Sequence, residues 1–197
     1  MLRRLACLVF LLLPPASSAQ SPTDLDGNPF DPFAVAAEPE TVPAVKAIVL
    51  AFAGPECPIS NRLAPDLIRV VRDFEKHGVR FYLVYPEVEV DGETARRHAA
   101  AYGYAFPALL DHGRVLVEKA QATILSEVAL FSPAGELLYR GRINDRVLDF
   151  GTLRPEPSRE DLRLALDDVL AGRPVAEPRT QAIGCIIRPD LESRRRP

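Results

Sequence analysis

The chain has no tryptophan, one methionine, three cysteines and three histidines among its 197 residues. Because His77, His98 and His112 are dispersed along the sequence, no pair of them has the spacing of metal ligands. The formal net charge of -3 provides no basic field for nucleic acid. No phosphate-binding glycine loop and no Ser/His/Asp hydrolase motif is present. The sequence therefore predicts no metal, no other cofactor and no nucleic-acid partner.

Long apolar runs are also absent, apart from one near the N-terminus. Residues 1–4 (MLRR) are positively charged, residues 5–13 are apolar, and the small residues Ser17 and Ala19 follow. This order is typical of a secretory signal peptide, so residues 1–19 are predicted to be a signal cut after Ala19. A membrane-anchoring first helix is the alternative, although the apolar run is shorter than a span needs. We expect an exported protein, periplasmic or extracellular, with no membrane span after signal removal.

Cysteine is scarce in the mature chain as well. Cys7 lies inside the predicted signal, which leaves only Cys57 and Cys185. Two cysteines give one possible intramolecular pairing, which argues against a disulfide-stapled scaffold. An exported protein does reach a compartment where a disulfide can persist. The roughly 175 residues after the signal are enough for one domain with a sizeable core.

The pattern of apolar residues predicts an α/β domain over residues 46–172. A lead-in (20–45) with a turn or hairpin signal at 24–29 (DLDGNP) precedes it, and a tail (173–197) that contains Cys185 follows. The periodicity predicts strands at 47–52, 79–85, 127–131 and 137–140, an extended stretch at 106–111, and helices at 57–76, 92–104, 114–120 and 158–172, the last capped by Ser158. Pro65 is expected to kink the first helix.

Cys57 stands where the first predicted strand meets the first predicted helix, immediately before Pro58. At this position its thiol faces the free N–H groups and the positive end of the helix dipole, which stabilise a thiolate. The thiolate is the nucleophile in thiol chemistry. The position therefore predicts thiol–disulfide or peroxide chemistry at Cys57.

The order β-α-β-α-β-β-α, with Cys57 at the first strand-to-helix junction and Pro65 eight residues later, resembles the thioredoxin fold, a central mixed β-sheet flanked by helices. More closely, the chain resembles exported members of the redoxin group, the alkyl hydroperoxide reductase and thiol-specific antioxidant superfamily. The resemblance implies a redox-active cysteine that acts on protein thiols and disulfides or on a peroxide. The matching stretches are 52–61, 104–111, 126–145 and 173–187.

Several positions depart from the family pattern. Thioredoxins carry a second cysteine where this chain has Ser60, and peroxiredoxins carry a threonine where it has Gly54. Ser126 stands where the fold usually has a cis-proline, and we expect an ordinary trans peptide there. Glu56 places a negative charge beside the thiol, which disfavours the thiolate, and Arg62 could offset that charge.

The redoxin resemblance also includes a late Gly-Cys-Ile segment, here Gly184-Cys185-Ile186. It implies that a flexible tail returns Cys185 to Cys57 as the resolving thiol. The alternative is a permanent disulfide between the two that only pins the tail, worth roughly 4–5 kcal/mol by loop-closure entropy. Cu(I) held by both thiols and a histidine has no CxxxC or methionine cluster to support it. A free, inert Cys57 is a further alternative.

The leading hypothesis is an exported thioredoxin-like thiol–disulfide oxidoreductase, with Cys57 as nucleophile and Cys185 as resolving thiol. The alternatives are a peroxiredoxin-like thiol peroxidase and a non-catalytic binding module that contains a structural disulfide. The charged stretch 140–146 (RGRINDR) is expected either to be solvated or to line a groove near Cys57. The oligomeric state is not predicted.

Overall fold

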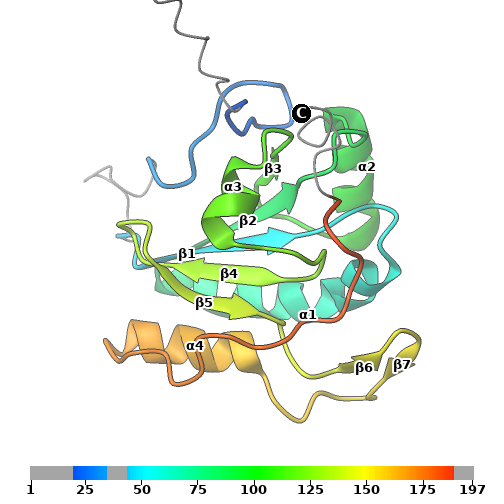
Figure 1. Cartoon of the computed structure of the whole chain (residues 1–197). Helices are drawn as coiled ribbons and strands as arrows, with labels where there is room; N and C mark the ends of the chain where they lie inside the picture. Colours follow the sequence, from blue (N-terminus) through cyan, green and yellow to red (C-terminus); the bar gives the residue numbers. More distant parts are fainter. Residues whose placement is uncertain (1–19, 35–43, 189–197) are drawn as a thin grey trace, which may run out of the picture.

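A computed structural model of the chain describes residues 20–34 and 44–188, so the predicted signal peptide lies outside the described residues. The centre of the described structure is a five-stranded sheet in the order β3-β2-β1-β4-β5 (Figure 1). The first three strands run parallel, whereas β4 runs antiparallel to β1 and β5 antiparallel to β4. The strands are β1 (Ala47–Phe52), β2 (Val79–Tyr85), β3 (Ala108–Leu110), β4 (Val128–Phe131) and β5 (Leu137–Gly141).

Helices cover both faces of this sheet. α1 (Pro58–Phe74) and α4 (Asp161–Leu170) lie along one face, and α3 (Val115–Ala120) lies over the other (Figure 1). α2 (Gly92–Tyr102) packs against α1 and β3. The predicted α/β class, with a mixed sheet flanked by helices, is confirmed.

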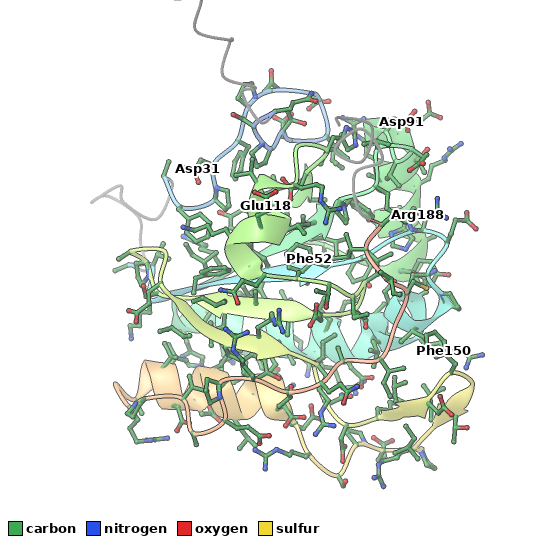
Figure 2. The ribbon with its side chains drawn as sticks, in the orientation of Figure 1. Asp31, Phe52, Asp91, Glu118, Phe150 and Arg188 are labelled. Carbon is green, nitrogen blue, oxygen red and sulfur yellow. The ribbon has the colours of Figure 1, made fainter. Side chains whose placement is uncertain are left out.

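β1 lies in the middle of the sheet, and all six of its residues are buried. A strand with neighbours on both sides and helices over both faces has no solvent-facing residues, so its sequence is a continuous apolar run. Phe52 marks the end of this strand, where the chain turns toward α1 (Figure 2).

α1 begins and ends with recognisable local signals. Pro58 occupies the first turn, where its missing N–H costs no hydrogen bond. Pro65 lies inside the helix at an exposed position, and the helix continues through it to Phe74. A short 3₁₀ turn, η2 (Glu75–His77), then ends at Gly78, whose φ of 87° favours glycine. The buried face of α1 carries Ile59, Ser60, Leu63, Ala64, Asp66, Leu67, Val70, Val71 and Phe74.

The lead-in extends the sheet beyond β3. Thr23 exchanges backbone hydrogen bonds with Leu110, at 3.0 and 2.9 Å, and forms a bridge with Pro29. Between the two bridge residues, Asp24 Oδ1 accepts the backbone N–H groups of Asp26 and Asn28, both at 2.9 Å. These bonds make a closed turn at the edge of the sheet.

The final helix differs from its prediction. α4 begins at Asp161, and its N-cap residue Glu160 makes no side-chain cap. The predicted cap by Ser158 is wrong, because the Ser158 hydroxyl donates to the carboxylate of Asp145 instead. The preceding residues also form a small hairpin that the sequence pattern does not predict, β6 (Val147–Asp149) and β7 (Thr152–Leu153).

The charged stretch 140–146 is buried or half-buried, so the expectation that it is solvated is wrong, and its Ile143 lines a small cavity with Ser60 and Ser126. Arg142 pairs with Asp161 at 2.6 Å, and Arg146 pairs with Asp66 at 3.3 Å. The carboxylates of Asp161 and Asp66 are buried. Burying an unpaired carboxylate is costly, so these arginines are required where two acidic side chains enter the core.

Candidate active site

Cys57 is the N-cap residue of α1, as its sequence position predicts. Its backbone is extended, with φ -88° and ψ 104°, and its N–H donates to the carbonyl of Gly54 at 3.0 Å. Its Sγ accepts the backbone N–H of Ser60 at 3.5 Å. The sulfur therefore takes the place of the oxygen of an ordinary N-cap and receives the N–H of the first helical turn. The residue is only 1% exposed.

Ser60, which replaces the second cysteine of a thioredoxin, holds the turn that precedes the helix. Its buried hydroxyl lies 3.1 Å from the carbonyl oxygen of Cys57 and 3.4 Å from that of Gly54. The side chain of Asn61 adds a hydrogen bond from Nδ2 to the carbonyl of Pro55 at 2.9 Å. Two neighbouring polar side chains thus fix the backbone on both sides of the thiol.

The C-terminal tail returns to this position as an extended segment. Residues 183–187, called the tail segment below, lie antiparallel to the loop 122–126 through a bridge between Ile124 and Ile186. Leu125 N–H donates to the carbonyl of Cys185 at 2.7 Å, and Ile187 N–H donates to the carbonyl of Thr123 at 2.9 Å. Arg188 marks the end of the described tail (Figure 2). The tail segment is therefore docked by backbone pairing, not held as the free arm that the sequence predicts.

Glycine is required where the tail segment crosses the loop. A Cβ atom at position 184 would lie 2.1 Å from the carbonyl oxygen of Leu125 and 2.6 Å from Ser126 Oγ. Ser126 also donates through its hydroxyl to the carbonyl of Ile183 at 3.0 Å. Its φ of 98° is unusual for a residue with a side chain. The position that usually holds a cis-proline therefore contacts the tail directly.

The two thiols meet at this crossing and differ in acidity. Burial raises the pKa of Cys57, but hydrogen bonds from the Cys185 thiol and from the backbone N–H groups of Ser60 and Cys185 outweigh it, so the pKa lies below its ordinary value. Burial, the hydrogen bond to Cys57 and the nearby charges of Cys57 and Glu87 raise the pKa of Cys185 to about 11. A proton left on the pair is therefore held on Cys185, and the negative charge lies on Cys57.

Glu87 lies near Cys185, and the acidic side chains of Glu56 and Glu89 lie near Glu87. The pKa of Glu87 lies above its ordinary value because burial and the charges of Glu89 and Glu56 raise it. The positive charge of Arg188 opposes this shift only in part. A Cβ atom at Gly54 would lie 2.8 Å from Leu125 Cδ1 and 3.0 Å from Glu87 Oε2. A side chain at position 54 would therefore require Leu125 and Glu87 to shift.

The predicted role of Arg62 finds no support in the contacts. Its side chain is exposed, and no ion pair joins it to Glu56 within residues 20–34 and 44–188. Both side chains border a shallow groove outside the thiol, together with Pro58 and Tyr102.

His98 is a buried polar residue that the sequence pattern does not single out, because it is one of three dispersed histidines. His98 is 6% exposed and lies between Tyr85 Oη at 2.7 Å and Asn61 Oδ1 at 2.8 Å. Burial lowers its pKa. The signal was available, because His98 lies three residues after Ala95 on the inward face of α2.

Among the described residues, no group of three or more His, Cys, Asp or Glu side chains is placed to hold a metal ion. No helix within the described ranges is both long and apolar enough to cross a membrane.

Solved structures with a similar arrangement identify the fold. An uncharacterized conserved protein from Geobacillus kaustophilus is 26% identical, with a TM-score of 0.72 over 87% of this chain and 88% of its own. A hypothetical protein from Sinorhizobium meliloti 1021 is 25% identical, with a TM-score of 0.68 over 83% of this chain and 87% of its own. A thioredoxin-like protein from Aeropyrum pernix is 17% identical, with a TM-score of 0.52 over 78% and 88%.

The chain has a thioredoxin-like fold. No protein-family model and no curated protein sequence matches it. In this thioredoxin-like protein, a cysteine is the N-cap residue of α1, and the tail places Cys185 beside the loop 122–126. The resemblance found in the sequence therefore holds for the fold.

Proposed function

We propose that this protein is an exported thiol–disulfide oxidoreductase of the redoxin group whose redox pair is Cys57 and Cys185. The observation that carries the proposal is that both cysteines lie against Leu125 at the start of α1, with Cys57 Sγ 4.0 Å from the Leu125 carbonyl oxygen and the Leu125 N–H donating to the Cys185 carbonyl at 2.7 Å. The pKa of Cys57 is lowered and that of Cys185 is raised. A lowered thiol pKa at a helix N-terminus is the usual property of reactive cysteines in this kind of chemistry. Residues 46–172 supply the frame, and the tail supplies the second thiol.

The cycle is a two-electron exchange. Once the tail segment moves aside and uncovers its sulfur, Cys57 attacks one sulfur of a substrate disulfide as the thiolate, and the other substrate sulfur leaves as a thiolate. Cys185 then attacks Cys57 in the mixed disulfide, gives its proton to solvent and releases the second substrate sulfur. The substrate disulfide is thereby reduced to two thiols, and the Cys57–Cys185 pair is oxidised to a disulfide.

A protein disulfide fits the site better than a peroxide does. Position 54 is glycine, so the threonine hydroxyl that bonds the peroxide in peroxiredoxins is missing, and a Cβ atom there would lie 2.8 Å from Leu125 Cδ1. The backbone edge of the loop 122–126, which binds the tail segment, offers an extended partner the same hydrogen bonds. We therefore favour disulfide exchange with protein thiols over peroxidase activity.

A second candidate is a non-catalytic binding module with a permanent Cys57–Cys185 bond. The burial of Cys57 under a docked tail favours this alternative, because a structural disulfide is usually covered. Residues 1–19, the predicted export signal, would place either version in a compartment that permits disulfides.

A redox titration of the mature protein, followed by alkylation and intact mass, tests the proposal. A disulfide that forms reversibly near about -200 mV supports catalysis, and one that resists reduction below about -300 mV indicates a staple. Cys57→Ser should abolish reduction of a disulfide substrate such as insulin. Full activity in that variant would rule out Cys57 as the nucleophile.

A further inference from the structure

The two sulfurs of the pair are not equally open to a reacting partner. Cys57 Sγ is enclosed by the Ser60 N–H at 3.5 Å and by the Leu125 carbonyl oxygen at 4.0 Å, and the residue is 1% exposed. Cys185 lies nearer the surface and is only partly buried. Its neighbour Ile186 is 70% exposed. A thiolate must reach the sulfur that it attacks, so with the tail docked Cys185 is the available sulfur.

The docking of the tail segment does not involve the sulfur of Cys185. The bonds that hold it run from Leu125 N–H to the Cys185 carbonyl and from Ile187 N–H to the Thr123 carbonyl. Because these are backbone bonds, they persist when the disulfide opens at the side chains. The tail therefore need not leave before a thiol attacks Cys185.

The two sulfurs also differ as leaving groups. Cys57, once released, is a thiolate that accepts the backbone N–H of Ser60 at 3.5 Å, and its pKa is lowered. Cys185 has its pKa raised to about 11. In thiol–disulfide exchange, the sulfur with the lower pKa leaves faster. The accessibility of Cys185 and the lower pKa of Cys57 thus both favour attack on Cys185 with Cys57 as the leaving group.

We propose that an external thiol reduces the oxidised protein by attacking Cys185, with Cys57 as the leaving group. This inference rests on the proposed redox cycle and names the sulfur that joins the reducing partner. The Cys57–Cys185 bond breaks, and Cys57 takes the electron pair as a thiolate while a bond forms between Cys185 and the thiol. A second thiol then attacks the donor sulfur of that mixed disulfide. Cys185 leaves, takes a proton from solvent, and two donor thiols have become one disulfide.

Mapping the mixed disulfide tests this assignment directly. The oxidised full mature chain is mixed with cysteamine, quenched in acid within the first turnover, digested with pepsin and analysed by mass spectrometry. Cysteamine is suitable because its positive charge is not repelled by Glu87 and Glu56. We expect cysteamine on Cys185 in about tenfold excess over Cys57. Cysteamine found mainly on Cys57 would overturn the proposal while leaving the redox cycle intact.

Two variants show whether the docked tail sets this preference. Gly184→Ala places a Cβ atom 2.1 Å from the Leu125 carbonyl oxygen and should loosen the segment. We expect the excess on Cys185 to fall severalfold in this variant. Ile186→Ala shortens an exposed side chain in the same segment, and the excess of cysteamine on Cys185 should be unchanged in this variant. An unchanged preference in Gly184→Ala would contradict the role of the tail, and thiols that never pair would overturn the proposed function itself.

Discussion

The buried carboxylate of Glu127 accepts the backbone N–H of Thr123 at 2.6 Å, and the same oxygen accepts the N–H of Ile124 at 2.9 Å. These bonds close the loop 122–126, which presents Leu125 to both cysteines. Where other thioredoxin-like folds rely on a cis-proline, this loop depends on a carboxylate one residue after Ser126. The site therefore depends on a side chain that touches neither sulfur.

Glu127→Gln should weaken this loop. The amide can present only its oxygen to two N–H groups and loses the charge that strengthens both bonds, so we expect a loss of about 1–3 kcal/mol in the free energy of unfolding. Urea titration measures this loss, and the rate of Cys57 alkylation in the reduced protein should rise. Glu136→Gln, at an exposed hairpin position, is the matched control. Equal effects of the two variants would contradict a special role for Glu127.

His98 should make stability depend on pH. Burial lowers its pKa below the ordinary 6.5, so the unfolded chain binds its proton more readily than the folded one. Its contribution is complete above about pH 6.5 and is lost as the pH falls from there toward the lowered pKa. Urea unfolding at about pH 7.5 and about pH 5.5 should show a smaller decrease for His98→Gln than for the unmodified protein. The same decrease in both proteins would exclude His98 as its source.

Gly54→Thr should not create a peroxidase. The added Cβ would overlap Leu125 Cδ1 at 2.8 Å and press on Glu87. Overpacking of this kind costs about 1–3 kcal/mol. Thermal unfolding should show the loss, and peroxide consumption should not increase. A gain in peroxide consumption would revive the peroxiredoxin-like alternative.

The charge of the donor thiol should affect the rate of reduction. The negative charges of Glu56 and Glu89 act on Glu87, and that of Glu87 acts on Cys185. We therefore expect oxidised protein to react faster with cysteamine, a cation, than with 2-mercaptoethanesulfonate, an anion. The difference should shrink in added salt and in Glu87→Gln. Glu118→Gln, on the exposed side of α3, should keep the full difference.

Cys185→Ala should raise the pKa of Cys57. The variant removes the thiol hydrogen bond that helps lower this pKa and leaves the burial that raises it. In the reduced unmodified protein, the Cys57 thiolate should persist to a lower pH than in the variant. The ultraviolet absorbance of the thiolate, followed against pH, measures the shift. An unchanged midpoint would show that Cys185 does not stabilise the thiolate.

The sheet and the cysteine at the start of α1 could be predicted because each depends on a local pattern. The apolar run of β1 and the Cys57-Pro58 junction are readable from a few consecutive residues. The same local reading placed a cap at Ser158, where a contact with distant Asp145 prevails. The local sequence shows that a serine can form a hydrogen bond but does not identify its partner.

The details of the site depend on contacts that are distant in sequence. Glu127 begins a predicted strand, and its local sequence does not indicate that its carboxylate accepts the N–H groups of Thr123 and Ile124. The docking of the tail uses mainly backbone groups, which every sequence has, so Gly184 and the hydroxyl of Ser126 are the side-chain features that indicate it. Charged residues such as Arg142 and Arg146 could not be assigned without the buried carboxylates that they neutralise.

Cys185 follows every strand of the central sheet in the chain. During synthesis the whole sheet and Cys57 therefore emerge before the thiol that covers the site, and domains begin to fold while the chain is still growing. For that interval, Cys57 has its helix but no partner thiol. The order of residues thus creates an interval in which a foreign disulfide can exchange with Cys57 and form a mixed disulfide that Cys185 is not yet present to resolve.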